Sequence, residues 1–70
     1  MKEKAIKKKL EEVKLSIAEG EIILGFLEQE LENAKASKDK DLINTYKLKI
    51  GENKKNLEIN EKWLKYLKTL

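Results

Sequence analysis

The sequence predicts an all-α protein: a two-helix antiparallel coiled-coil hairpin that dimerises into a four-helix bundle. Three observations lead to this prediction. The chain of 70 residues has no proline, and the polar segment at residues 36–41 (ASKDKD) is the one clear interruption of its helix-forming sequence. On each side of that segment, apolar residues recur at spacings of three and four, as they do in helices that pack along a seam. The phase of this repeat changes across the segment.

The first helix is expected at about residues 3–36. Its seam positions, the a and d positions of a heptad, are Ile6, Leu10, Val13, Ile17, Gly20, Leu24, Leu27, Leu31 and Ala34. Gly20 is the one member without a side chain, and we interpret it as room for a large residue on the opposite helix. That room costs about 1 kcal/mol in helix propensity.

A turn is expected at about residues 37–39. The seam of an uninterrupted helix would continue onto Lys38, Asp41, Thr45 and Leu48. Three of these residues are polar, so the chain is expected to turn rather than continue. Ser37 and Asp39 are favourable residue types for the N-cap of a following helix, although the segment lacks the glycine that helix C-termini favour.

The second helix is expected at about residues 40–69. Its seam positions are Ile43, Tyr46, Ile50, Asn53, Leu57, Asn60, Leu64 and Leu67. When the chain folds back, opposed seam residues have numbers that sum to 77, for example Gly20 with Leu57. Half of 77 is 38.5, which places the turn inside the polar segment independently of its composition. The two asparagines either specify the alignment of the helices or contact water in a wet part of the seam.

Charged e positions face each other in an antiparallel pair of helices. The predicted cross-helix pairs are Glu28 with Lys47, Glu21 with Lys54, and Lys14 with Glu61. The last pair has its signs reversed, which favours one register. Each exposed pair contributes about 0 to 1 kcal/mol, so these charges are expected to affect register more than stability.

One side of the predicted hairpin is apolar along both helices. This apolar flank comprises Ile23, Phe26, Leu42, Ile59, Trp63, Tyr66 and Leu70, at the g and c positions of the heptads. A monomer seldom leaves such a strip in water, and a second copy of the hairpin would cover it with a self-complementary interface. We therefore expect the flank to be a homodimer interface, with a ligand groove as the alternative. Three further apolar residues, Leu15, Ile22 and Leu48, fall at f positions and either widen that contact or mark another partner surface.

The opposite flank is charged and contains two glycines at b positions. Gly25 and Gly51 sum to 76, so they are expected to lie at the same level of the hairpin and to leave a shallow notch. A closely packed third helix could use this notch. Two glycines tolerated on a solvent-exposed face are the simpler interpretation.

The open end of the predicted hairpin is basic. Residues 1–9 carry +4 and residues 61–70 carry +2, which leaves 3 − 6 = −3 for the rest of the chain. The basic end comprises Lys2, Lys4, Lys7, Lys8, Lys9, Lys62, Lys65 and Lys68, and these lysines are the candidate contacts for an anion or a nucleic acid. Solvated lysines without a ligand are the competing interpretation, because all sixteen cations are lysine and no arginine is present for bidentate phosphate contacts.

The composition gives little support to catalysis. The chain has no histidine, no cysteine and no glycine-rich phosphate loop, so we expect no catalytic residues, no metal site and no cofactor. After the Lys-rich start, glutamates occupy the place where an export signal would need an apolar run, and the longest nearly apolar run, IILGFL, has six residues. A cytoplasmic protein is expected, with docking on a membrane surface through residues 60–70 (NEKWLKYLKTL) as a third, weaker alternative.

Two hypotheses of different class follow for one small domain spanning residues 1–70. The first is a non-enzymatic protein–protein interaction module, a small homodimeric hairpin that acts on a protein partner of unknown identity as an adaptor, regulator or inhibitor. The second is a protein that binds RNA or DNA through its basic end.

Overall fold

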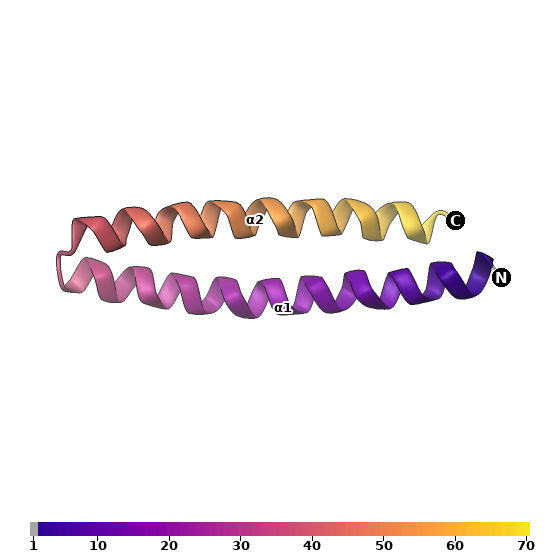
Figure 1. Cartoon of the computed structure of the whole chain (residues 1–70), viewed down its shortest axis with the longest axis horizontal. Helices are drawn as coiled ribbons and strands as arrows, with labels where there is room; N and C mark the ends of the chain where they lie inside the picture. Colours follow the sequence, from indigo (N-terminus) through magenta and orange to yellow (C-terminus); the bar gives the residue numbers. More distant parts are fainter. Residues whose placement is uncertain (1) are drawn as a thin grey trace.

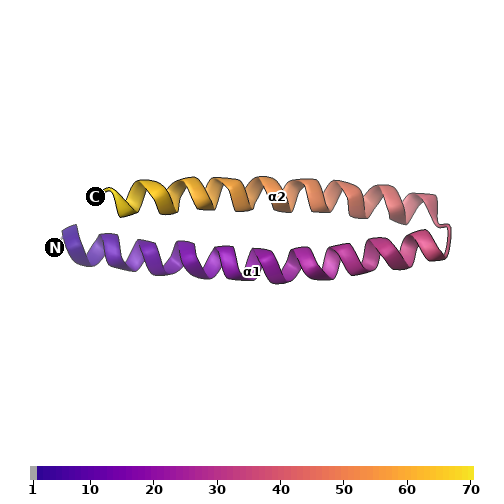
Figure 2. The same cartoon turned by 180° about the vertical axis from the view of Figure 1, so that it is seen from behind.

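The computed structural model describes residues 2–70 and contains two long helices. Helix α1 (Lys2–Ala36) and helix α2 (Lys40–Lys68) run in opposite directions side by side, so that the two termini lie at one end and the turn at the other (Figures 1 and 2). The hairpin measures 54 × 14 × 12 Å, which matches the length of about 52 Å that 35 helical residues span at 1.5 Å per residue. The predicted all-helical fold with two packed helices is confirmed.

The seam between the helices is the one predicted from the sequence. The buried residues are Val13, Ala34, Ile50 and Leu67, and all four are seam residues. The half-buried residues of the described chain are the other thirteen seam positions, and every residue outside the seam is exposed. The heptad spacing alone therefore identifies which face of each helix packs against the other.

The register of the two helices is fixed most visibly at Gly20. A Cβ atom placed on Gly20 would lie 2.7 Å from Cδ2 and 3.2 Å from Cγ of Leu57, so Leu57 occupies the space that the missing side chain leaves. These two residues sum to 77, as the alignment predicted from the sequence requires. Nearby, Asn53 Nδ2 donates a hydrogen bond of 2.9 Å to the backbone carbonyl of Gly20. Asn53 thus links α2 to α1, as expected of an asparagine that specifies alignment.

Residues 37–39 turn the chain with two overlapping caps. The N–H of Asp39 donates to the carbonyl of Ala34 and that of Lys38 to the carbonyl of Lys35, both at 3.1 Å, which is the hydrogen-bond pattern of a Schellman motif. Lys38 has a φ of 57°, the left-handed conformation that glycine usually supplies at this position. Asp39 then caps α2, because its Oδ1 accepts a hydrogen bond of 3.2 Å from the N–H of Leu42. One residue therefore ends the first cap and begins the second.

The ion pairs differ from the prediction. Residues 2–70 form two ion pairs, Lys9 with Glu12 at 3.8 Å and Glu32 with Lys35 at 3.7 Å, and both lie within α1. None of the three predicted cross-helix pairs is formed among residues 2–70. Long exposed side chains lose rotamer freedom when they pair, and the attraction between them in water barely offsets that loss.

Candidate functional site

The apolar flank lies in solvent along one side of the hairpin. All seven of its side chains are exposed, from 43% for Leu42 to 69% for Phe26. They come from both helices, with Ile23 and Phe26 on α1, four residues on α2, and Leu70 just beyond the end of α2. The structure therefore leaves in water the set of residues that the sequence predicts to be an interface.

The aromatic part of this flank is concentrated near the open end. The rings of Trp63 and Tyr66 are 6.0 Å apart and meet edge to face, at an interplanar angle of 78°. Together with Ile59 and Lys62 they line an open hollow of about 320 Å³. These four residues follow one another at helical spacings of three and one on α2, so the hollow lies along one helix rather than between two. Trp63 is still 45% exposed, and a partner surface could cover it.

Lys9 reaches this aromatic cluster from the opposite helix. Its Nζ lies 5.8 Å from the centroid of the Trp63 ring and 3.8 Å from the carboxylate of Glu12. A cation over a tryptophan face contributes about 0.5–1 kcal/mol at an exposed site. The sequence analysis assigned Lys9 to the basic end and did not predict this contact. In the predicted alignment, where facing residues have numbers that sum to 77, Trp63 lies opposite residue 14 of α1. The long side chain of Lys9 can nevertheless reach the tryptophan ring.

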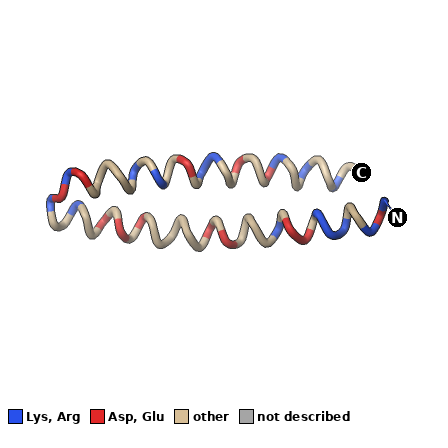
Figure 3. The backbone as a smooth tube through the Cα atoms, viewed as in Figure 1, with Lys and Arg blue, Asp and Glu red and all other residues tan. Residues whose placement is uncertain are grey.

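The lysines of the basic end are all exposed. Blue segments for lysine gather at the N-terminal end of α1 and recur along the last turns of α2 beside it (Figure 3). A second hollow, of about 470 Å³, lies at this end and is lined by Lys2, Ala5, Ile6, Tyr66 and Leu70. The open end therefore combines positive charge with exposed apolar side chains from both helices.

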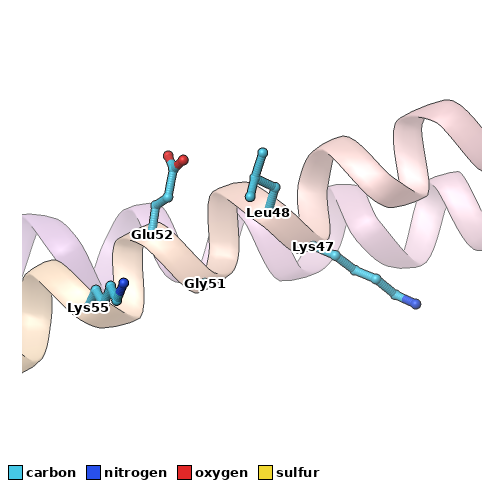
Figure 4. Close-up of a pocket in the computed structure, with 5 residues that line it drawn as sticks. All are labelled: Lys47, Leu48, Gly51, Glu52 and Lys55. Atoms are coloured by element: carbon cyan, nitrogen blue, oxygen red, sulfur yellow. The ribbon is translucent and has the colours of Figure 1, made fainter.

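A third hollow surrounds Gly51 on the outer side of α2. It measures about 300 Å³ and is lined by Lys47, Leu48, Gly51, Glu52 and Lys55, all from α2 (Figure 4). A hollow is present at Gly51, but Gly25 does not line it, so the structure does not show the notch that was predicted from the two glycines together. Leu48, which has no place in the seam or the apolar flank, is 65% exposed beside this hollow.

Among residues 2–70, no three or more histidine, cysteine, aspartate or glutamate side chains lie close enough together to hold a metal ion. Neither α1 nor α2 has the run of apolar residues needed to cross a membrane. The exposed features of the described residues are the apolar flank, the basic end and the hollow at Gly51.

Comparison with known proteins gives no relative from which a function could be transferred. No protein-family model, no curated protein and no solved structure matches this chain.

Proposed function

We propose that the protein is a non-enzymatic protein–protein interaction module, a homodimeric helical hairpin that acts as an adaptor, regulator or inhibitor. The observation that carries this proposal is the apolar flank, with seven exposed side chains in a strip that spans both helices. Such a strip is typical of a surface that a protein partner covers.

The exposed area of the single hairpin supports a large interface. A compact monomer of 8.2 kDa exposes about 4500 Å², by the usual scaling of surface with mass. The hairpin exposes 5898 Å², an excess of about 1400 Å² over that value. A stable complex of standard size removes about 800 Å² from each partner, so the excess is large enough for one such interface.

A second copy of the chain is the occupant that best suits the flank. A two-fold interface needs one self-complementary surface, and the aliphatic and aromatic side chains of the flank can meet one another in it. The same g and c positions also hold charged residues, Glu19, Glu30, Lys49 and Glu52 among them, which the interface has to accommodate. Four helices also enclose a core, whereas the two helices of this structure bury only four residues.

The double substitution Phe26→Glu with Trp63→Glu tests the dimer by sedimentation and circular dichroism. We expect the wild type to sediment as a dimer and the variant as a monomer of lower stability, because four carboxylates per dimer would have to be desolvated. Leu15→Glu with Leu48→Glu is the matched comparison, since these residues are 61% and 65% exposed but lie off the flank. An unchanged dimer is expected, and a monomer would show that these residues widen the contact. A wild-type protein that is monomeric at micromolar concentration with intact helicity would contradict the proposal.

Binding of RNA or DNA at the basic end is the second candidate, supported by the charge of +6 that the two termini bring together. Phosphate binding by lysine releases counterions, so affinity must fall steeply as the salt concentration rises. Titration with RNA and DNA oligonucleotides at low and moderate salt tests this function. If the protein bound neither RNA nor DNA at about 50 mM salt, the nucleic-acid-binding function would be excluded.

A further inference from the structure

Two hairpins that pack through the same flank about a two-fold axis have two possible arrangements. If the axis runs along the hairpins, both turns lie at one end and α1 of each copy faces α2 of the other. If the axis runs across the hairpins, the turns lie at opposite ends and each helix faces the same helix of the second copy. The choice between them rests on the proposed dimer and can be made from the positions of the flank residues.

With both turns at one end, the aromatic cluster would meet polar residues. Residues at equal levels would face each other, and the alignment seen at Gly20 and Leu57 places Trp63 level with residue 14 of α1. Trp63 would then face Glu12 and Ser16 of the second copy, the flank positions of α1 at that level. The two basic ends, each with a charge of +6, would also lie together. Both consequences disfavour this arrangement.

With the turns at opposite ends, each helix must pair its flank with a reversed copy of itself. On α1 the apolar flank residues are Ile23 and Phe26, and pairing one with the other places the axis at position 24.5. On α2 the pairing of Leu42 with Trp63 places the axis at position 52.5. Positions 24.5 and 52.5 sum to 77, as the numbers of the facing residues Gly20 and Leu57 do. The two positions therefore lie at the same level of the hairpin, and one straight axis can pass through both. Of the pairings that the flank residues of the second half of the chain allow, that of Leu42 with Trp63 is therefore the one consistent with the axis on α1.

We propose that the protein forms a dimer with its turns at opposite ends, about an axis that crosses α1 between Ile23 and Phe26 and α2 between Leu42 and Trp63. Residues of α2 that face each other across this axis have numbers that sum to 105, as Leu42 and Trp63 do. Ile59 therefore lies opposite Tyr46 of the second copy. The turn of each copy, at position 38.5, falls opposite position 66.5 of α2 and position 10.5 of α1 in the other copy. The first ten residues therefore extend past the partner's turn.

This overhang leaves much of the basic end uncovered in the dimer. Lys2, Ala5 and Ile6, with Leu70, line the hollow of about 470 Å³ at the open end, and all four lie in the overhang. Trp63 is covered and Leu70 is not. The arrangement thus explains how one chain can use its flank for assembly while its lysines remain available at both ends of the dimer.

Two features of this arrangement are unfavourable. Glu52 is at a flank position of α2 beside the axis at 52.5, so it would face Glu52 of the second copy.

The second feature, on α1, provides a test. Residues of α1 that face each other across the axis have numbers that sum to 49, as Ile23 and Phe26 do. Glu19 of one copy therefore faces Glu30 of the second copy, and Glu30 faces Glu19. Glu19→Lys or Glu30→Lys alone would replace two repulsive pairs by two attractive ones, and we expect each to lower the dimer dissociation constant by about three- to tenfold. The variant with both substitutions restores like charges and should return close to the wild-type value. With both turns at one end these residues would not meet, and the two substitutions would act independently.

Spin labels measure the arrangement directly. The chain has no cysteine, so Ala36→Cys gives a single attachment site at the exposed end of α1. Ala36 lies 11.5 residues from the axis, so two labels would be separated along the bundle by 23 residues, or about 35 Å at 1.5 Å per residue. With both turns at one end the labels would lie within about 20 Å, given that packed helices are 8–10 Å apart.

The outcomes separate this inference from the proposed function. A dimer with the long distance and with coupled charge substitutions supports the arrangement. A dimer by sedimentation with the short distance, or with independent effects at Glu19 and Glu30, overturns the arrangement and leaves the proposed homodimer intact. A wild-type monomer overturns both.

Discussion

Substitution of the three glycines by alanine should have opposite effects at different sites. Alanine is favoured over glycine by about 1 kcal/mol in a helix interior, and none of the three glycines has a positive φ. At Gly25 and Gly51 an added Cβ atom would meet nothing within 4 Å. We therefore expect Gly25→Ala and Gly51→Ala each to stabilise the protein by about 1 kcal/mol.

Gly20→Ala should be destabilising relative to these two controls. The added Cβ atom would lie 2.7 Å from Cδ2 of Leu57 and 3.2 Å from its Cγ, so rotation of one methyl group would not relieve the whole overlap. Insertion of a methyl group into a packed core costs about 1–3 kcal/mol. After the gain in propensity, Gly20→Ala should change the free energy of unfolding by about 0 to −2 kcal/mol, which places it about 1–3 kcal/mol below Gly25→Ala.

Thermal and urea unfolding followed by circular dichroism measure these differences. For a domain of this size 1 kcal/mol corresponds to about 4–8 °C in melting temperature. The variants must be compared at one protein concentration, because the stability of a dimer depends on it. If Gly20→Ala stabilised the protein as much as Gly25→Ala, Leu57 would not fill the space at Gly20 and the deduced register would be wrong.

Two further predictions concern the turn and the seam. Lys38→Gly should raise the free energy of unfolding by about 1 kcal/mol, because glycine adopts the φ of 57° without the cost that lysine incurs; an unchanged urea midpoint would contradict this conformation. Asn60→Leu should stabilise the protein more than Asn53→Leu, by about 1 kcal/mol, because only Asn53 gives up a hydrogen bond to the carbonyl of Gly20. Equal effects in urea unfolding would show that this bond contributes nothing net.

The seam could be predicted from the sequence because it depends on one periodic property. A repeat of three and four places nine residues on one face of α1 and eight on one face of α2, and the polar segment between them limits where the chain can turn. Reversal of the chain then allows one alignment in which Gly20 meets a large residue such as Leu57. No knowledge of the neighbouring atoms is needed for either step.

The turn and the ion pairs depend on finer balances. The left-handed conformation of Lys38 is unfavourable for the residue itself and is compensated by hydrogen bonds from Lys38 and Asp39 to the last carbonyls of α1. The composition of ASKDKD gives no indication of this, because glycine is absent. The cross-helix ion pairs were not formed because the energies involved are close to zero, so opposite charges at facing positions do not determine a side-chain rotamer.

The composition of the candidate site could be predicted, but its surroundings could not. Phe26, Trp63 and Tyr66 share a flank because the heptad places them there. The contact of Lys9 with Trp63 depends on the rotamer of a long side chain, and the hollow at Gly51 depends on the neighbours of Leu48.

The seam and the apolar flank are adjacent parts of one apolar surface. Ala34 is 2% exposed and Val13 is 4% exposed, yet thirteen of the seventeen seam residues are only half-buried, because two helices cover a seam from two sides and leave its edges open. On the charged flank those edges are bordered by lysine and glutamate, whereas on the apolar flank they continue into Ile59 and Trp63. A second hairpin on that flank would bury its own contact residues and also close one edge of the seam. Dimerisation would thus stabilise the hairpin itself, and the two helices and their assembly would fold as one cooperative unit.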